Sequence, residues 1–401
     1  MRTITAHKKE TAPLNYLTDE EKKFQNHVKH FAQTEVSPLI HQMDNDAKMD
    51  KGLTNSLFTE GLMNIEIPEA YGGSAHPFFY SILAIEEMAI VDPAVAVFID
   101  VHNTLVVNAF IRWGTESQKE RFLPRLANGT VGAFSITEEE AGSDAASLTC
   151  RAEKVDNGYI LNGKKHWVTN AAEAELFIMF AKVPSSNPAQ SSSSGHLTAF
   201  IIDKNVSEGI TVCEPQLKMG IRASSTCDMI MDNVFVPDEN VLGSRSKGLM
   251  ILLETLSDGR IGISAQMLGL AQGAFDEAVK YSGERIQFGE YISTYQGVHF
   301  PLAQLATEIQ AVRLMIYNAV RMKQAKCNFR ELVLHSSMVK LYASQVAERA
   351  ASQCLEIIGG KGYMKGNVLE KLYRDAKIGT IYEGTSNIQL SNIARHYVKI
   401  K

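Results

Sequence analysis

The sequence is poor in cysteine, and its few cysteines are not arranged in pairs. The 401 residues include five of them, at positions 150, 213, 227, 327 and 354. An odd number without a Cys-x-x-Cys spacing argues against a disulfide framework and against a zinc knuckle. We therefore expect a reducing compartment and no bound metal.

An excess of charge and a long apolar run are also absent. The formal net charge is −5. Proteins that bind nucleic acid or anionic membranes usually carry a basic surface, so neither partner is expected. No run of about 18 apolar residues is present, so no membrane span is predicted. The first 21 residues have neither the apolar core of a signal peptide nor a clear arginine-rich presequence, although a processed organellar protein would look the same.

The two most familiar nucleotide-binding signatures are missing. No Gly-x-Gly-x-x-Gly opens a helix after a strand, and no Gly-x-x-x-x-Gly-Lys-Ser/Thr occurs. A Rossmann site and a P-loop are therefore both unsupported. Any nucleotide cofactor must be bound in another way.

The hydrophobic period divides the chain into three parts. Helical spacing begins after Thr18, which stands three residues before Glu21 as in a capping box, and the apolar segments 79–92 and 94–114 should be buried helices. His102, in the second segment, is expected to be a core histidine. Strand character holds from about Phe134 to Gly243, and helical spacing then returns. We predict an α+β fold with an N-terminal helical domain (1–133), a middle antiparallel β domain (134–243) and a C-terminal helical domain (244–401).

Local turn signals refine this division. Asn157-Gly158 and Asn162-Gly163 are hairpin signals, and Gly359-Gly360 predicts the end of a long helix that includes 338–358. The serine-rich segment 184–195 has no apolar anchor, so a flexible surface loop is expected there.

Four short segments could carry chemistry, although each has a plainer interpretation. The run 133–146 offers Thr137 and Ser143, whose hydroxyls could bind a phosphate or flavin edge, but a polar turn would look similar. Trp167 could stack on a ring or simply fill the core. Arg285, with Phe288, could meet a diphosphate or be a surface cation. Glu383, in an otherwise apolar stretch, could be functional, solvated or a helix cap.

Six motifs in order, TEEEAGSDAA, HWVTN, RIGISAQMLGLAQGAFD, ERIQFG, LEIIGGKGY and RDAKIGTIYEGTSNIQL, give the chain from about Leu17 a resemblance to the acyl-CoA dehydrogenase family. KMGIRASST, HNTL, GRIGISAQMLGLAQG and KIGTIYEG resemble its short/branched-chain members most. The resemblance implies a C-terminal four-helix bundle and an FAD-dependent oxidation of acyl-CoA to trans-2-enoyl-CoA. It further implies electron-transfer flavoprotein as the acceptor, a homotetramer, and the mitochondrial matrix if the source is eukaryotic or the cytoplasm otherwise.

The resemblance also implies roles for individual residues. Those expected to line the flavin ring are Phe134, Ile136, Thr137, Trp167 and Thr169. Those expected at the cofactor's adenosine diphosphate, from a neighbouring subunit, are Arg285, Phe288, Gln296, Glu356 and Gly360. Further flavin contacts are implied for Thr385 and Asn387, and contacts with the CoA chain for Ser143, Ser257, Asp258, Arg260 and Gly384.

The catalytic base is implied to be Glu383. Some branches of the family carry the base on the preceding long helix instead, but there this sequence has Gly259, which has no side chain to serve. The sequence departs from the family at Glu139 and Glu140, at Leu249, and at Pro301 inside an expected helix. An oxygen-using acyl-CoA oxidase and a catalytically silent acyl-CoA binding protein remain alternatives; the lack of a long extra C-terminal domain disfavours the first, and retention of the base and flavin-side residues disfavours the second.

Overall fold

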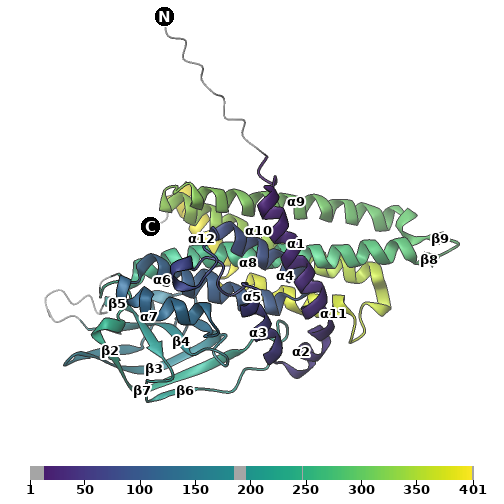
Figure 1. Ribbon diagram of the computed structural model, residues 1–401. Coiled ribbons are helices and arrows are strands. Elements are labelled where there is room, and N and C mark those ends of the chain that lie inside the picture. Colours follow the sequence, from purple (N-terminus) through teal and green to yellow (C-terminus); the bar gives the residue numbers. More distant parts are fainter. Residues whose placement is uncertain (1–12, 185–195, 246, 400–401) are drawn as a thin grey trace, which may run out of the picture.

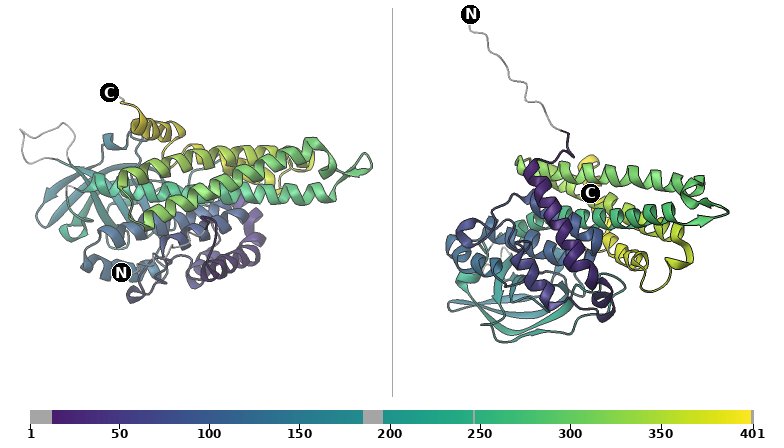
Figure 2. Two further views of the ribbon diagram at one scale, coloured as in Figure 1. Left: turned by 90° about the horizontal axis from the view of Figure 1, so that it is seen from above. Right: turned by 45° about the vertical axis from the view of Figure 1, so that its right-hand side comes forward.

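The computed structural model describes residues 13–184, 196–245 and 247–399 of the chain. A curled β-sheet and a bundle of long C-terminal helices are joined by helices from the N-terminal third (Figure 1). The bundle extends well past the sheet on one side, as further views show (Figure 2). The predicted order of helices, strands and helices is confirmed. Most of the serine-rich segment, 185–195, lies outside the described residues.

The first helix begins where the capping-box spacing predicts. The Glu21 N–H donates to the Thr18 hydroxyl at 3.2 Å, and the Thr18 N–H donates to the Glu21 carboxylate at 2.8 Å. The helical elements of this region are α1 (Asp19–Phe31), η1 (Ala32–Val36), η2 (Ser37–Leu39), α2 (Ile40–Asp46), α3 (Lys51–Thr59), η3 (Glu69–Tyr71), α4 (Phe78–Val91), α5 (Pro93–Asp100), η4 (Val101–Val107), α6 (Asn108–Trp113) and α7 (Glu116–Ala127).

The two apolar segments form buried helices, as expected. α4 covers the first, and α5, η4 and α6 form a continuous helical run over the second, with a π-helical stretch at η4. The run Pro93–Trp113 is apolar and long enough to cross a membrane by length and composition, but 94% of its most apolar stretch is buried inside the protein. His102 is a core residue, and its Nδ1 accepts a hydrogen bond from the Gly132 N–H at 3.1 Å.

The sheet is mainly antiparallel, with β1 paired in parallel to β4. Asn157, at φ 61°, lies in the tight turn between β2 and β3, so the first predicted hairpin is confirmed. The second is wrong, because Asn162 and Gly163 lie inside β3, opposite a bulge in β7 that places an extra residue between Met231 and Val234. An asparagine followed by a glycine is compatible with a strand as well as with a turn, and pairing with the long strand β7 decides which forms. The strands are β1 (Gly132–Ser135), β2 (Arg151–Val155), β3 (Gly158–Thr169), β4 (Leu176–Val183), β5 (His196–Asp203), β6 (Ile210–Val212) and β7 (Thr226–Pro237).

The C-terminal part consists mainly of long helices. Gly359, at φ 70°, ends α10 where the glycine pair predicts. Pro301 lies in the second turn of α9, which nevertheless continues to Gln324. The elements are α8 (Gly248–Glu284), β8 (Ile286–Gln287), β9 (Glu290–Tyr291), η8 (Ile292–Thr294), α9 (Gln296–Gln324), α10 (Phe329–Ile358), η9 (Gly359–Lys361), α11 (Val368–Ala376), η10 (Lys377–Thr380) and α12 (Ser386–Tyr397), after the short η5 (Ala145–Ser147) and η7 (Asp238–Asn240) of the middle region.

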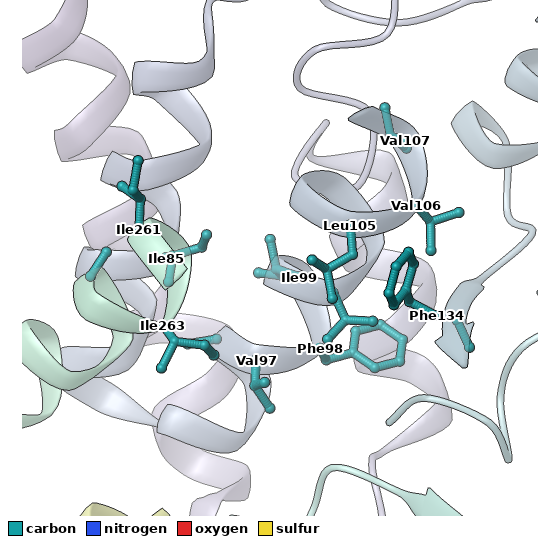
Figure 3. Close-up of a cluster of buried hydrophobic side chains, with 14 of the residues drawn as sticks. Ile85, Val97, Phe98, Ile99, Leu105, Val106, Val107, Phe134, Ile261 and Ile263 are labelled. Atoms are coloured by element: carbon teal, nitrogen blue, oxygen red, sulfur yellow. The ribbon is translucent and has the colours of Figure 1, made fainter. Parts of the chain in front are cut away.

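A single apolar core connects the three parts. Figure 3 shows Leu105 and Val106 of η4 beside Phe134 of β1, with Ile261 and Ile263 of α8 on the other side of the N-terminal helices. Because η4 touches both β1 and α8, it sets the position of the sheet relative to the bundle. The candidate site forms along this junction.

Candidate active site

Glu383 lies in the turn between η10 and α12, and its backbone is in the left-handed region. Its φ is 52°, and that of Gly384 is 87°. A left-handed non-glycine residue costs about 1–3 kcal/mol and persists only where its surroundings hold it. Thr385 then caps α12, because its side chain accepts a hydrogen bond from the Ile388 N–H at 3.3 Å.

Two side chains from neighbouring helices hold this turn through its carbonyl groups. The Gln389 amide of α12 donates to the carbonyls of Glu383 at 3.0 Å and Gly384 at 2.8 Å. The Lys340 ammonium of α10 donates to the Gly384 carbonyl at 2.7 Å. A Cβ at Gly384 would lie 2.6 Å from the Gln389 amide nitrogen, so this position requires glycine.

Gly259 of α8 provides the space that the Glu383 carboxylate occupies. A Cβ at Gly259 would lie 2.8 Å from Glu383 Oε2 and 2.6 Å from Leu105 Cδ2. Glu383 Oε2 is buried and has no hydrogen-bond partner among the described residues. The carboxylate therefore has a free lone pair inside the protein, which a proton-abstracting base requires.

The charges around Glu383 come from three helices and the turn itself. Burial raises the pKa of Glu383, while the cations Arg260 of α8 and Lys340 of α10 act to lower it. Burial lowers the pKa of Lys340 to about 8. Burial also raises the pKa of Asp100 on α5 and the pKa of the Tyr382 hydroxyl, which precedes Glu383 in the turn. The Asp100 carboxylate accepts a hydrogen bond from the Thr104 hydroxyl at 2.7 Å.

The second half of the candidate site is the end of the sheet where β1 and β3 finish. β3 has a bulge between Lys165 and Val168, and there Trp167 has a φ of 53° and is 60% exposed. Burial alternates from Trp167 to buried Val168 to partly exposed Thr169, in keeping with the expectation that Trp167 and Thr169 share a face. The exposed Trp167 ring, on the same strand face as the Thr169 hydroxyl, is suited to stacking against a flat cofactor.

The loop after β1 is anchored to this bulge by a buried ion pair. Lys165 Nζ contacts Glu138 at 2.8 Å and the Ile136 carbonyl at 3.0 Å. Glu138 also accepts hydrogen bonds from the Thr149 hydroxyl at 2.7 Å and the Cys150 N–H at 3.0 Å. Burial opposes ionisation of Glu138, but Lys165 holds its pKa below the usual value.

The same loop carries several of the predicted contact residues. Ile136 and Thr137 are partly exposed, whereas Ser143 and the two unusual glutamates, Glu139 and Glu140, are exposed. The Thr137 carbonyl accepts a hydrogen bond from the His166 N–H at 2.8 Å, which keeps the start of the loop against the β3 bulge.

The sheet end and Glu383 face the same junction. The Asn170 amide, just past β3, donates to the Phe98 carbonyl of α5 at 3.0 Å. Phe134 lies beside Leu105 (Figure 3), and Leu105 in turn borders Gly259 and so Glu383. Phe134 of β1 and Glu383, which are far apart in the sequence, therefore lie on either side of Leu105.

A third set of predicted residues lies elsewhere. Arg285 and Phe288 belong to the β8–β9 hairpin, at the end of the bundle that extends away from the sheet (Figure 1). Within a single chain, this third set of residues does not reach the end of the sheet that carries Trp167 and Thr169. The members of this set, all exposed, are Arg285, Phe288, Gln296, Glu356 and Gly360.

The remaining predicted residues lie on α8 and at the start of α12. Ser257 is buried and its hydroxyl donates to the Leu253 carbonyl of its own helix at 2.8 Å. Asp258 pairs with Lys323 of α9 at 2.5 Å, so contact of its carboxylate with CoA would require that ion pair to open. Arg260 is buried with its Nε unpartnered among the described residues. Asn387 is exposed.

Sequence reasoning missed three polar residues at this site: Lys340, Gln389 and Asp100. A charged residue in the apolar segment 94–114 was the available signal for Asp100. Lys340 had no comparable signal, because its role depends on a carbonyl that lies 44 residues further along the chain.

Comparison with known proteins identifies the family of the chain. Sequence models of three acyl-CoA dehydrogenase domains match the chain: the N-terminal domain over residues 18–130, the middle domain over 133–234 and the C-terminal domain over 246–398. The chain belongs to the acyl-CoA dehydrogenase family.

Individual known proteins resemble the chain over most or all of their length. The rat short/branched chain specific acyl-CoA dehydrogenase, mitochondrial, is 46% identical over 96% of this chain and 87% of its own. Butyryl-CoA dehydrogenase from Megasphaera elsdenii superposes with a TM-score of 0.90 at 36% identity, over 96% and 99% of the two chains. A chain from a structure described as the electron transferring flavoprotein of Acidaminococcus fermentans has a TM-score of 0.91 at 34% identity, over 96% and 100%.

The protein is an oxidoreductase, and its cofactor is FAD. The residues present fit such a group. At the ends of β1 and β3, the Trp167 ring is exposed, and the buried Ser135 hydroxyl and the buried side-chain Oδ1 of Asn170 have no hydrogen-bond partners among the described residues. No group of three or more metal-ligating side chains occurs in the part of the chain that the structure describes.

Proposed function

We propose that the protein removes two hydrogens across Cα–Cβ of a short or branched acyl-CoA to give the trans-2-enoyl-CoA, with Glu383 as the base. The observation that carries this proposal is the buried Glu383 carboxylate, which lies beside Gly259 and whose Oε2 has no hydrogen-bond partner in the part of the chain that the structure describes. A carboxylate in that state can take a proton without first breaking a hydrogen bond.

Glu383 has a difficult proton to remove, because the α-carbon of a thioester is a very weak acid. Burial increases the basicity of its carboxylate, and Arg260 and Lys340 keep the ionised form accessible. The Glu383 backbone N–H would donate to the thioester oxygen, and single donors of this kind are typically worth about 3 kcal/mol. FAD, when bound, supplies the acceptor for the Cβ hydride.

The other residues would bind and orient the reactants. Phe134, Ile136, Thr137, Trp167 and Thr169 would line the flavin, with Thr385 and Asn387 nearby, and Ser143 would contact CoA. Ser257, Asp258, Arg260 and Gly384 would face the acyl-CoA chain. The exposed residues of the β8–β9 end would complete the site of a second copy, in the homotetramer that the family resemblance implies. We retain domains at 1–133, 134–243 and 244–401.

The acyl group, the acceptor and the compartment are part of this proposal. The names of the rat short/branched chain specific enzyme and of butyryl-CoA dehydrogenase from Megasphaera elsdenii support a short or branched acyl group. Within that class we propose acyl groups of about four to five carbons, including 2-methyl-branched ones, as the resemblance to the short/branched-chain members implies. The Acidaminococcus fermentans structure supports electron-transfer flavoprotein as the acceptor. The rat relative is mitochondrial, so a eukaryotic source would place this protein in the matrix.

Anaerobic flavin bleaching tests the proposal. Short straight and 2-methyl-branched acyl-CoAs should bleach the bound flavin fastest, and the reduced enzyme should be reoxidised faster by electron-transfer flavoprotein than by oxygen. Glu383→Gln should still bind acyl-CoA, seen as a perturbed flavin spectrum, but reduce flavin about 100 to 10,000-fold more slowly.

The matched control is Glu348→Gln, on the neighbouring helix α10, where the carboxylate pairs with Lys377 at the surface. It should behave as the parent protein does. Near-normal flavin reduction by Glu383→Gln would show that the base lies elsewhere. A clear preference for chains longer than about ten carbons would refute the short-chain assignment, and rapid reoxidation by oxygen would favour an oxidase.

A further inference from the structure

Three lysines are buried in the described part of the chain, and one of them differs from the other two. Lys165 pairs with Glu138 at 2.8 Å, and Lys371 pairs with Asp92 at 2.9 Å and Asp375 at 2.6 Å. Among the described residues, no carboxylate lies within 4.0 Å of the Lys340 ammonium, which is fully buried. A buried charge without a counter-ion is costly, so stability alone does not account for Lys340.

The partner that Lys340 does have belongs to the turn that presents Glu383. Its Nζ donates to the Gly384 carbonyl at 2.7 Å. One helical turn further along α10, the Ser344 hydroxyl donates to the Gly379 carbonyl at 2.7 Å. One face of α10 therefore holds the segment 379–384 at both ends.

We propose that Lys340 is a positioning residue for Glu383: it holds the left-handed turn through the Gly384 carbonyl and places a positive charge near the carboxylate without bonding to it. This inference rests on the proposed role of Glu383 as the base. A direct salt bridge would occupy the carboxylate oxygens, whereas Glu383 Oε2 has no hydrogen-bond partner within residues 13–184, 196–245 and 247–399. Lys340 thus stabilises the ionised base and leaves its lone pair free.

The electrostatic part of the proposal makes a signed prediction. The charged or titratable groups that face Glu383 are Arg260 from α8, Lys340 from α10, Asp100 from α5 and Tyr382 from the turn. Removing the Lys340 charge leaves Arg260 as the remaining cation, so the pKa of Glu383 rises. The acid limb of flavin reduction should then move to higher pH by about one unit, the low end of what a nearby opposite charge produces.

The experiment is the pH dependence of single-turnover flavin reduction in the intact holoenzyme. Lys340→Met should reduce flavin at least about ten-fold more slowly at neutral pH and show the shifted acid limb. Lys340→Gln, which keeps a donor for the Gly384 carbonyl but not the charge, should recover part of the rate and keep the shift. The matched control is Gln389→Leu, which removes a neutral donor from the same carbonyls: its rate should fall with the acid limb unmoved.

An unmoved acid limb in both Lys340 variants would overturn the proposal, as would failure of both variants to fold with bound flavin, since Lys340 would then be purely structural. The proposed function fails on a different result, near-normal flavin reduction by Glu383→Gln. The two failures are therefore distinguishable.

Discussion

At the scale of single residues, the candidate site depends as much on an absent side chain as on a present one. Gly259 stands on α8 where a Cβ would meet both Glu383 Oε2 and Leu105 Cδ2. The family resemblance implies two alternative positions for the base, and here the glycine at the first position leaves room for the proposed base at the second. Gly259 and Glu383 are therefore a matched pair.

Gly259→Ala should slow flavin reduction by about 10 to 100-fold, because a contact of 2.8 Å forces the carboxylate away and a small misplacement of a reacting group has an effect of this size. Gly283→Ala is the matched control, since Gly283 lies on the same helix with no atom near the added Cβ. Stopped-flow reduction by the preferred acyl-CoA measures both. Equal rates for the two variants would contradict the crowding argument.

At the scale of elements, the loop after β1 is held against β3 by one buried ion pair. Lys165→Met leaves the Glu138 carboxylate buried without its cation, which typically costs about 3–5 kcal/mol. We expect a clearly lower Tm and faster loss of flavin, because this loop carries Ile136 and Thr137.

The exposed pair Lys154–Asp238, at 2.9 Å in the same sheet, provides the comparison for Lys165→Met. Lys154→Met should change stability by no more than about 1 kcal/mol, because solvent screens the pair. The Tm and the rate of flavin release are measured for both variants. Similar losses in the two would show that the Lys165–Glu138 pair does not anchor the loop.

The helical run through η4 carries a prediction about pH. Burial lowers the pKa of His102 to about 4, from an ordinary value of 6.5. The unfolded chain therefore takes up a proton as pH falls through 6.5 while the folded chain does not, so this group lowers stability progressively from about pH 6.5 towards 4, by at most about 3 kcal/mol.

His102→Gln offers the Gly132 N–H an acceptor but does not titrate. Its Tm should fall less steeply than that of the parent protein as pH decreases below 6.5. Melting curves recorded at a series of pH values measure this. If the Tm of the two proteins fell in parallel with decreasing pH, His102 would not be the source of the acid destabilisation.

At the scale of the whole molecule, the exposed residues at the β8–β9 end lie far from the sheet of their own chain. If they complete the FAD site of a second copy, Arg285→Ala should lower flavin retention in the oligomer, because a cation that pairs with a diphosphate is removed. Arg330→Ala is a suitable control, since that exposed arginine begins α10 at the other end of the bundle. Flavin stoichiometry after gel filtration measures the effect, and full retention in Arg285→Ala would count against the contact.

Local signals in the sequence determined much of this protein. The three-part order, the capping box at Thr18, the turn at Asn157 and the end of α10 at Gly359 depend on interactions within a few residues, so periodicity and turn chemistry suffice to predict them. The motifs were likewise enough to identify Glu383 and the flavin-side residues as candidates.

Tertiary structure alone decided what depends on contacts between distant segments. The strand conformation of Asn162 and Gly163 needs β7, the Lys165–Glu138 pair needs β3 beside β1, and the Glu383 carboxylate needs the space that Gly259 leaves on another helix. A local pattern contains no information about which distant backbone or side chain will lie opposite, and that pairing is set by the packing of the common core. The candidate site forms at those pairings, so its residues could be predicted singly but its geometry could not.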